Sequence, residues 1–243
     1  MKDIKNYIFK VLLIGCVAYA IIMMVHWPIG FTFFTQLSNI FAAVVAAIQL
    51  IYEKRRCSNE KEGYARCILI LKYMAAVSLF VTFLVFLLFL APVVPGGYIA
   101  AYAQDHCASL CMHLLSPILI YCDLFICDRK REWISVSPLY SALPLLVYFI
   151  FILVLGACGF RWRFANGTVM SAPYSFLNYT SPAGWFGFKP ETMGITSTGI
   201  GVFYVVIVMT ALVLVIGKDL HVRLCKAGRS RDDSEYDNRP GEI

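Results

Sequence analysis

Residues 102–127, YAQDHCASLCMHLLSPILIYCDLFIC, form an apolar segment that is long enough to cross a bilayer and that carries a histidine well inside it. An ionisable side chain is costly in hydrocarbon, so it indicates a functional site by default. On a helix, the polar residues of this segment recur at steps of three or four, which predicts a polar stripe that faces other helices and not lipid. The stripe consists of His106, Ser109, His113 and either Ser116 or Pro117.

The composition of the chain defines its class. Hydrophobic residues make up 60% of the 243 positions and charged residues only 15%, which is more apolar surface than a soluble domain of this size needs. The net charge of +6 does not indicate nucleic acid, because the basic residues lie in short runs between apolar segments. The sequence therefore predicts an all-α polytopic membrane protein with six transmembrane helices. The predicted spans are residues 7–25, 31–52, 68–91, 102–127, 139–160 and 197–217.

The distribution of Lys and Arg predicts the orientation. Of the 21 basic residues, 18 lie in the amino-terminal segment, the second-to-third and fourth-to-fifth connections and the tail, and three lie on the other side. By the positive-inside rule both termini are then cytoplasmic, if the protein lies in a plasma membrane. We expect residues 1–220 to form a single membrane domain with an outer loop at 161–196, and residues 221–243 to form a charged, disordered cytoplasmic tail.

Two polar patches are predicted to lie in one layer of the membrane. The second span enters from the non-cytoplasmic face near Phe31, which places Thr35 about 6 Å and Asn39 about 12 Å below that face. The fourth span enters from the same face near Asp105, which places His113 about 12 Å below it. If the two helices pack together, a hydroxyl, an imidazole and an amide meet in the outer half of the membrane.

A hydroxyl beside an imidazole has the chemistry needed to attack an ester. The Thr35 hydroxyl is a weak nucleophile until a base takes its proton, and a buried, neutral His113 suits that task. The tetrahedral intermediate then needs hydrogen-bond donors around its oxyanion, for which Gln36, Ser38, Asn39 and backbone N–H groups are candidates. The sequence does not select among them.

The predicted outer loop, residues 161–196, is rich in Trp, Tyr and Phe. Such a loop is too apolar to extend freely into water, so we expect it to fold onto the membrane surface above the polar layer. It would serve there as a lid over a lipid-entry site or as an interfacial aromatic belt. Arg161 and Arg163 are its only arginines, and we hypothesise that one of them holds an anionic group of a membrane lipid.

Three short motifs lie at these same positions. They are Phe33-Phe34-Thr35 at the head of the second span, Met112-His113 followed by Pro117 in the fourth, and Pro173-Tyr174-Ser175-Phe176-Leu177 in the outer loop. Together they resemble the androgen-induced membrane hydrolase family, over roughly residues 7–220. The resemblance implies six helices and the hydrolysis of fatty acid esters of hydroxy fatty acids, with Thr35 as nucleophile and His113 as base. The TxxSN pattern that begins at Thr35 is more similar to the bacterial relatives of this family, whose activity is unknown.

Other interpretations of the polar residues remain open. Thr35 and Asn39 can serve only to bond neighbouring helices, in which case the protein is a non-enzymatic bundle or a small-molecule transporter. Paired intramembrane charges or an inverted repeat would favour transport, and the sequence shows neither. Asp123 lies about 15 Å along the helix from His113, so we expect it to pair with Lys72 or to cap the bundle, although a proton path is also consistent with it.

The cysteines and the third span are expected to be structural. The nine cysteines include no C-x-x-C pair, and we interpret them mainly as small buried hydrophobic residues. His106, Cys107, Cys111 and His113 do not have the spacing of a metal site, because adjacent positions on a helix point in different directions. We expect no metal and no cofactor, and Cys111 remains an alternative nucleophile.

The third span, residues 68–91, is expected to be a scaffold helix that faces lipid.

Overall fold

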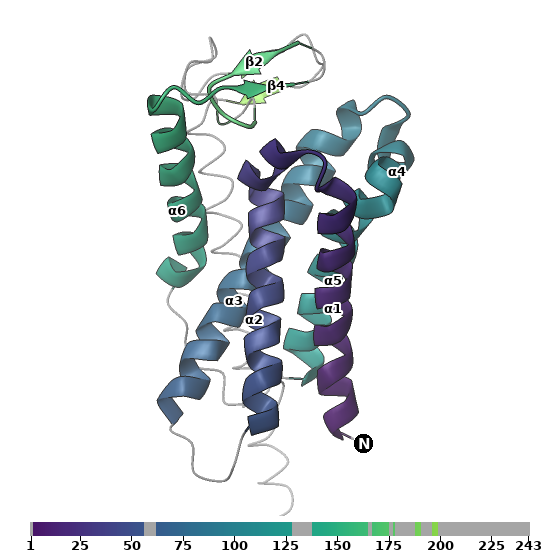
Figure 1. Ribbon diagram of the computed structural model, residues 1–243, viewed down its shortest axis with the longest axis vertical. Helices are drawn as coiled ribbons and strands as arrows, with labels where there is room; N and C mark the ends of the chain where they lie inside the picture. The colour runs from purple at the N-terminus through teal and green to yellow at the C-terminus, as the bar shows by residue number, and fades with distance from the viewer. Residues whose placement is uncertain are drawn as a thin grey trace, which may run out of the picture.

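The computed structural model describes residues 2–55, 62–127, 138–164, 167–174, 177, 188–190 and 196–198, and these are mostly helical (Figure 1). In chain order the helical elements are α1 (Lys2–Met24), the 3-10 turn η1 (Pro28–Thr32), α2 (Phe34–Arg55), α3 (Glu62–Val85), the π-helical η2 (Phe86–Leu90), the 3-10 turn η3 (Ala91–Val93), α4 (Gly97–Leu110), the π-helical η4 (Cys111–Leu115), α5 (Ser116–Cys122), the π-helical η5 (Asp123–Cys127) and α6 (Pro138–Ala157).

Four short strands form two antiparallel hairpins. Strand β1 (Trp162–Arg163) pairs with β2 (Val169–Met170), and β3 (Phe188–Pro190) pairs with β4 (Thr196–Thr198). The end of the bundle that carries η1, β1 and β2 is called the loop end, and α1 begins at the opposite end (Figure 1).

Four helical segments of the described residues are long and apolar enough to cross a membrane: Tyr7–Met24, Phe34–Glu53, Cys67–Leu88 and Gly97–Ile126. They coincide with the first four predicted spans. The fifth predicted span falls on α6, whose apolar part is shorter, Ala142–Ala157.

The sixth predicted span and the tail fall almost wholly outside the described residues. Only the first two positions of that span, Ser197 and Thr198, are described, and they lie in β4 and not in a helix. Ser197 pairs there with Lys189 of β3, in a short polar and β-branched stretch that suits a strand. Residues 199–217 of the predicted span and the predicted tail, 221–243, lie outside the described part of the chain.

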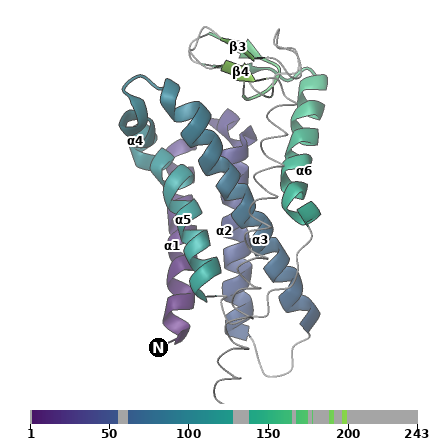
Figure 2. The same ribbon diagram turned by 180° about the vertical axis from the view of Figure 1, so that it is seen from behind.

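The helices pack around α2 and α3. Helix α2 contacts α1 on one side and α3 on the other, α1 contacts α4 and α5, and α6 packs on α3 (Figures 1 and 2). Small side chains let the central helices approach closely, since Ala42 and Ala46 of α2 and Ala75 and Ala76 of α3 are buried in one cluster with larger residues of α1 and α5. This arrangement positions the head of α2 beside the fourth span, which comprises residues 97–127.

The prediction that the third span faces lipid was wrong. Of the four candidate spans, Cys67–Leu88, which contains most of α3, has the largest buried share, 61%. It is covered by α2, α5 and α6, and it buries the hydroxyl groups of Ser78 and Thr82. Because hydrophobic residues occur all round this helix, the sequence pattern does not show which faces meet protein and which meet lipid.

The fourth span is broken near the loop end. The backbone leaves the helical region at Gln104, and Asp105, His106 and Cys107 adopt left-handed conformations with φ of 49°, 55° and 68°. For residues with a Cβ this conformation costs about 1–2 kcal/mol each. A carbonyl released by the break, that of His106, accepts a 2.6 Å hydrogen bond from the Tyr19 hydroxyl. The predicted polar stripe therefore does not include His106, whose side chain is exposed.

Candidate functional site

Thr35 and His113 meet near the loop end of the bundle. Thr35 lies in the first turn of α2 and His113 in η4, and the Thr35 Oγ1 atom is 3.3 Å from His113 Nε2. Continuous helix in the fourth span resumes only at Ala108, so His113 lies about 8 Å below the break. The two groups are called the hydroxyl–imidazole pair below.

The surroundings of His113 determine which ring nitrogen carries the proton. Nδ1 lies 2.9 Å from the carbonyl oxygen of Ser109, and a carbonyl can only accept, so Nδ1–H is the donor. The hydroxyl of Ser109 is also 3.3 Å from Nδ1. The ring of Phe86 stacks on the imidazole, with centroids 3.8 Å apart and planes at 24°. In the neutral tautomer Nε2 is then the acceptor, and it is oriented toward the Thr35 hydroxyl.

Ser38 and Asn39 hold the backbone behind Thr35. The Ser38 hydroxyl donates to the carbonyl oxygen of Thr35 at 3.0 Å and lies 2.9 Å from the hydroxyl of Thr82 in α3. The Asn39 amide donates to the carbonyl oxygens of Thr35 at 2.8 Å and of Met112 at 3.2 Å. Both N–H donors of Asn39 are thus directed at main-chain carbonyls. The structure gives these residues a positioning role at α2 and η4 in place of the expected contact with an oxyanion.

Gln36, the remaining oxyanion candidate of the second span, points elsewhere. Its amide nitrogen is 3.7 Å from the sulfur of Met24 at the end of α1. The side chain is buried, and within the described residues its oxygen has no hydrogen-bond partner. Gln36 therefore lies at the contact of α1 with α2, and no hydrogen bond joins it to the hydroxyl–imidazole pair.

Tyr174, which sequence reasoning did not assign to the site, contacts Thr35. Its ring is buried and packs edge-on against Phe33, with centroids 5.1 Å apart. Its phenolic oxygen forms hydrogen bonds with the side chain of Thr35 and with the backbone of Thr35 and Phe34. Burial raises the pKa of Tyr174 to about 12, although these hydrogen bonds act in the opposite direction. The motif at residues 173–177 was the only sequence signal for this residue.

The chain after α6 folds onto the head of α2 through aromatic side chains. Trp162 is fully buried, and its indole N–H donates to the hydroxyl of Thr32 at 2.8 Å. The Tyr148 hydroxyl donates to the carbonyl oxygen of Thr32 at 3.1 Å, and Phe164 packs edge-on against Phe33. The described part of the predicted outer loop therefore packs on the head of α2, next to Thr35.

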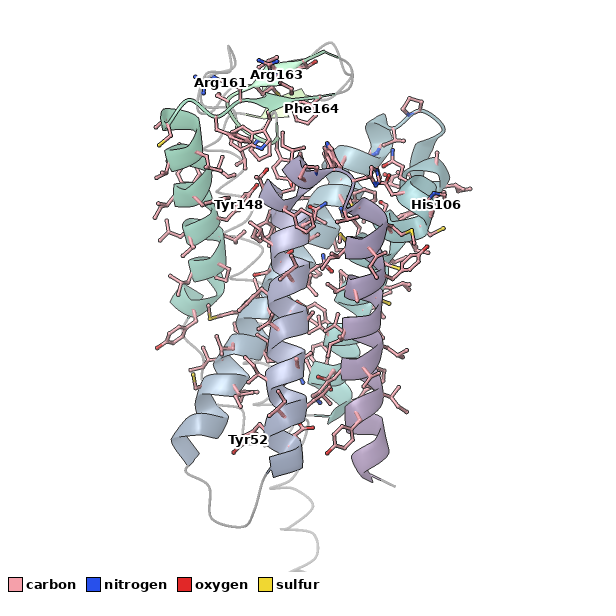
Figure 3. All side chains as sticks on the ribbon, in the orientation of Figure 1. Tyr52, His106, Tyr148, Arg161, Arg163 and Phe164 are labelled. Carbon is pink, nitrogen blue, oxygen red and sulfur yellow. The ribbon has the colours of Figure 1, made fainter. Side chains whose placement is uncertain are left out.

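The two arginines of this loop lie at the outer edge of the loop end (Figure 3). The Arg161 guanidinium donates to the carbonyl oxygens of Gly156 at 2.9 Å and of Phe160 at 2.8 Å, so it caps the end of α6. Arg163 is exposed on β1. Neither arginine makes a described contact with Thr35 or His113.

A cavity of about 460 Å³ lies between α2, α3 and α6. Its walls are mostly apolar, and Ser38 and Ser78 contribute hydroxyl groups. From α2 it is lined by Phe34, Leu37, Ser38 and Phe41. Phe34 directly precedes Thr35, which itself lies on the neighbouring face toward His113. Its volume falls in the range of pockets that hold small organic ligands.

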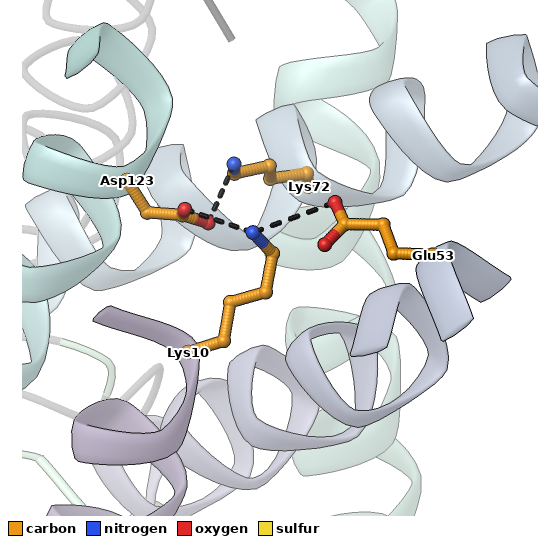
Figure 4. A network of polar contacts seen from close by, with 4 residues as sticks. All are labelled: Lys10, Glu53, Lys72 and Asp123. Carbon is orange, nitrogen blue, oxygen red and sulfur yellow. Dashed lines mark hydrogen bonds and ion pairs between the residues drawn. The ribbon is translucent and has the colours of Figure 1, made fainter. Parts of the chain in front are cut away.

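Four charged side chains, Lys10, Glu53, Lys72 and Asp123, form a cluster of ion pairs (Figure 4). Asp123 pairs with Lys72 at 2.6 Å, as expected, and also with Lys10 at 3.0 Å. Lys10 is in turn 3.6 Å from Glu53. The cluster joins α1, α2, α3 and η5, and Lys10, Lys72 and Asp123 are buried. The expectation that the spans lack paired charges was therefore wrong, because each helix contributes a single ionisable residue and only packing brings them together.

The described cysteines are less buried than the sequence predicted. Cys16, Cys111 and Cys122 are half-buried, and the exposed ones are Cys67, Cys107 and Cys158, so none is the fully buried hydrophobe that the sequence suggested. Cys111 lies beside Cys16 of α1. Within the described part of the chain, no group of three or more His, Cys, Asp or Glu residues is placed to hold a metal ion.

No family model, curated protein or solved structure matches this chain. Its class is defined by the described helices, which are compatible with a membrane protein. Within that class, it carries a partly buried hydroxyl–imidazole pair near the loop end and a buried charge cluster toward the other end.

Proposed function

We propose that the protein is a membrane-embedded hydrolase of lipid esters, with Thr35 as the nucleophile and His113 as the general base. The observation that carries this proposal is the 3.3 Å contact between Thr35 Oγ1 and His113 Nε2, in a tautomer fixed by the Ser109 carbonyl. Nucleophile, base and a third group that orients the base are the parts required for acyl transfer through a hydroxyl. Apo geometry of this length is usual for such pairs, which tighten when substrate binds.

The reaction proceeds through an acyl-enzyme. Thr35 Oγ1 bonds to the ester carbonyl carbon while its proton passes to His113 Nε2. The tetrahedral intermediate collapses, the bond to the leaving alkoxy oxygen breaks, and that oxygen takes the proton from His113. Water then gives a proton to Nε2 as it attacks the acyl carbon, and the return of this proton to Thr35 releases the carboxylic acid and restores the enzyme.

A six-span topology with both termini in the cytoplasm completes the proposal. With 18 of the 21 basic residues on one side, the loop end faces the non-cytoplasmic side, and the hydroxyl–imidazole pair lies beneath the outer headgroups. The apolar cavity next to Phe34 and Ser38 supports a substrate with an acyl chain. The resemblance to the androgen-induced membrane hydrolase family supports the same roles for Thr35 and His113.

Labelling with a fluorophosphonate probe tests this proposal. The probe should label the folded protein covalently, and Thr35→Ala and His113→Ala should each abolish labelling. Matched controls are Tyr19→Phe, which removes a hydroxyl that donates to the carbonyl oxygen of His106, and His26→Ala, which removes an exposed imidazole. Labelling in the controls but not in the two variants supports the enzyme. Absence of labelling in folded wild-type protein, or labelling that survives both variants, refutes it.

The charge cluster favours a second candidate function, transport of a small molecule or ion. Ionisable residues inside membrane spans that pair with one another often mark ion pathways, and Lys10, Lys72 and Asp123 are buried in this way. In proteoliposomes a transporter would show proton or solute flux that Asp123→Asn abolishes and Thr35→Ala leaves intact. If both variants change only the stability of the fold, the polar groups serve helix packing alone.

A further inference from the structure

The helical turn that carries His113 is wider than a regular α-helical turn. At the end of η4 the backbone N–H of Ser116 donates to the carbonyl oxygen of Cys111, and not to that of Met112, which it would meet in an α-helix. In the wider turn the donor for the Met112 carbonyl would be the N–H of residue 117. That residue is a proline, which has no N–H. Neither position 116 nor position 117 therefore donates to the Met112 carbonyl.

Asn39 of α2 supplies the missing donor from across the bundle. Its amide nitrogen lies 3.2 Å from the carbonyl oxygen of Met112. Asn39 is 0% and Met112 only 1% exposed, so this carbonyl lies in the interior of the protein. A buried carbonyl without a partner is costly. The proline thereby favours a hydrogen bond between two helices at a point where a regular helix would bond only to itself.

The same amide holds the backbone of the nucleophile. Asn39 also donates to the carbonyl oxygen of Thr35 at 2.8 Å. The Thr35 carbonyl belongs to the peptide group that directly follows the nucleophile, and the Met112 carbonyl to the one that directly precedes the base. One side chain therefore joins α2 to η4 beside the 3.3 Å contact between Thr35 Oγ1 and His113 Nε2.

We propose that Pro117 is a positioning residue of the hydrolase, which leaves the Met112 carbonyl free for Asn39 because it lacks a backbone donor. This inference rests on the proposed function of Thr35 and His113. The proline ring acts in the same direction, since in an α-helix it would clash with the carbonyl four residues earlier, that of His113. A wider turn relieves this clash. Pro117 acts through Asn39 on the distance and angle between the nucleophile and the base.

A pair of replacements at position 117 isolates the missing donor. Pro117 is buried, so a small residue is chosen. Pro117→Ala restores an N–H that can donate to the His113 carbonyl, which allows the turn to contract and Ser116 to donate to Met112. Asn39 then loses its acceptor in η4. The matched control carries lactic acid at position 117, introduced by nonsense suppression, which has the methyl group of alanine but an ester oxygen in place of the N–H.

The full-length protein in detergent micelles is assayed with p-nitrophenyl octanoate for kcat and KM, and with a fluorophosphonate for the rate of covalent labelling. Misplacement of a reacting group by about 1 Å can cost about 10²-fold in rate. We expect kcat and the labelling rate of Pro117→Ala to fall by about 10- to 10²-fold, with KM changed by less than about twofold. The lactic acid protein should keep kcat within about threefold of wild type.

Thermal unfolding distinguishes positioning from a merely structural role. Alanine is a better helix former than proline, so the midpoint of unfolding of Pro117→Ala should not fall. A proline that serves only the fold would give no loss of kcat in a protein of unchanged stability. Should Pro117→Ala fail to fold, Pro117→Val and its ester analogue repeat the comparison with a side chain that fills the space of the ring.

Combination with Asn39→Leu tests the link between the two residues. Asn39→Leu alone should slow labelling, and adding it to Pro117→Ala should slow labelling by no more than about twofold further. The reason is that each change breaks the same connection between α2 and η4. Effects that multiply in the double variant would show that the two residues act separately, which overturns the inference.

The remaining outcomes separate this inference from the proposed function. If Thr35→Ala is inactive while Pro117→Ala retains its kcat, Pro117 does not position the base and the hydrolase proposal stands. If Pro117→Ala and the lactic acid protein lose activity equally, the ring and not the missing donor is responsible, and the inference is overturned. If the wild-type protein neither turns over the ester nor reacts with the probe, both proposals fail together.

Discussion

Replacing Asp123 by Asn should destabilise the fold strongly, because one carboxylate serves two buried ammonium groups. Asp123 lies 2.6 Å from Lys72 and 3.0 Å from Lys10, and both lysine side chains are only 1% exposed. The amide keeps the shape of the carboxylate and removes its charge. Glu53→Gln is a matched control in the same cluster, since Glu53 is 3.6 Å from Lys10 and its side chain is 14% exposed.

The expected magnitudes follow from these distances and from burial. At an effective dielectric constant of about 20, the attraction of Asp123 for each lysine is about 5–6 kcal/mol before desolvation is subtracted. Desolvation offsets most of this gain, but it persists when the carboxylate is removed, so loss of one partner of a buried pair costs about 3–5 kcal/mol. Glu53 is better solvated, and its loss should cost about 1 kcal/mol. In the double variant with Lys72→Met, part of the loss should be recovered, with a coupling of about 1–3 kcal/mol.

Reversible unfolding in mixed micelles of a mild detergent and dodecyl sulfate measures these differences. Far-ultraviolet circular dichroism gives the fraction folded, and the free energy of unfolding is compared among wild type, the single variants Asp123→Asn, Glu53→Gln and Lys72→Met, and the double variant. The reasoning is refuted if Asp123→Asn costs no more than Glu53→Gln. A double variant with Lys72→Met whose loss equals the sum of the single losses would show that the pair is not coupled.

Three further predictions concern the loop end. Asn39→Leu removes two hydrogen bonds to carbonyl oxygens. It should therefore lower the free energy of unfolding by about 1 kcal/mol and slow fluorophosphonate labelling. If both values are unchanged, Asn39 has no positioning role. Tyr174 has a pKa raised to about 12 in the folded state, against about 10 for a free phenol, so it favours folding below pH 10, and this contribution should decline as the pH rises from 10 through 12. An ultraviolet titration compares wild type with Tyr174→Phe. The variant should lack a phenol that ionises near pH 12, and a variant that instead lacks a phenol with an ordinary pKa would refute this. Arg161→Ala should destabilise the protein by about 1 kcal/mol through lost capping of α6, whereas Arg163→Ala should stay within about 0.5 kcal/mol in thermal unfolding, and equal effects would contradict the assigned contacts.

The sequence by itself determined the class of the protein and much of the layout of its helices. The excess of apolar residues and the length of the apolar runs are local properties, and they placed the first four spans where the structure has long apolar helices. The fixed rise of a helix also allowed the depths of Thr35 and His113 to be compared before any packing was known. The break of the fourth span was not predicted, because nothing in the composition of residues 104–107 signals a left-handed turn.

Only the tertiary structure decided which side chains meet. Tyr174 lies 139 positions after Thr35, and Lys10 and Asp123 are separated by 113, so their contacts depend on how whole helices and loops are placed. The burial of α3 could not be predicted for a related reason. A helix that is apolar all round has the same sequence pattern whether lipid or protein surrounds it. Local sequence fixes which residues are helical and how deep they lie, whereas the neighbours across the bundle follow from packing, and the chemistry proposed for this protein depends on those neighbours.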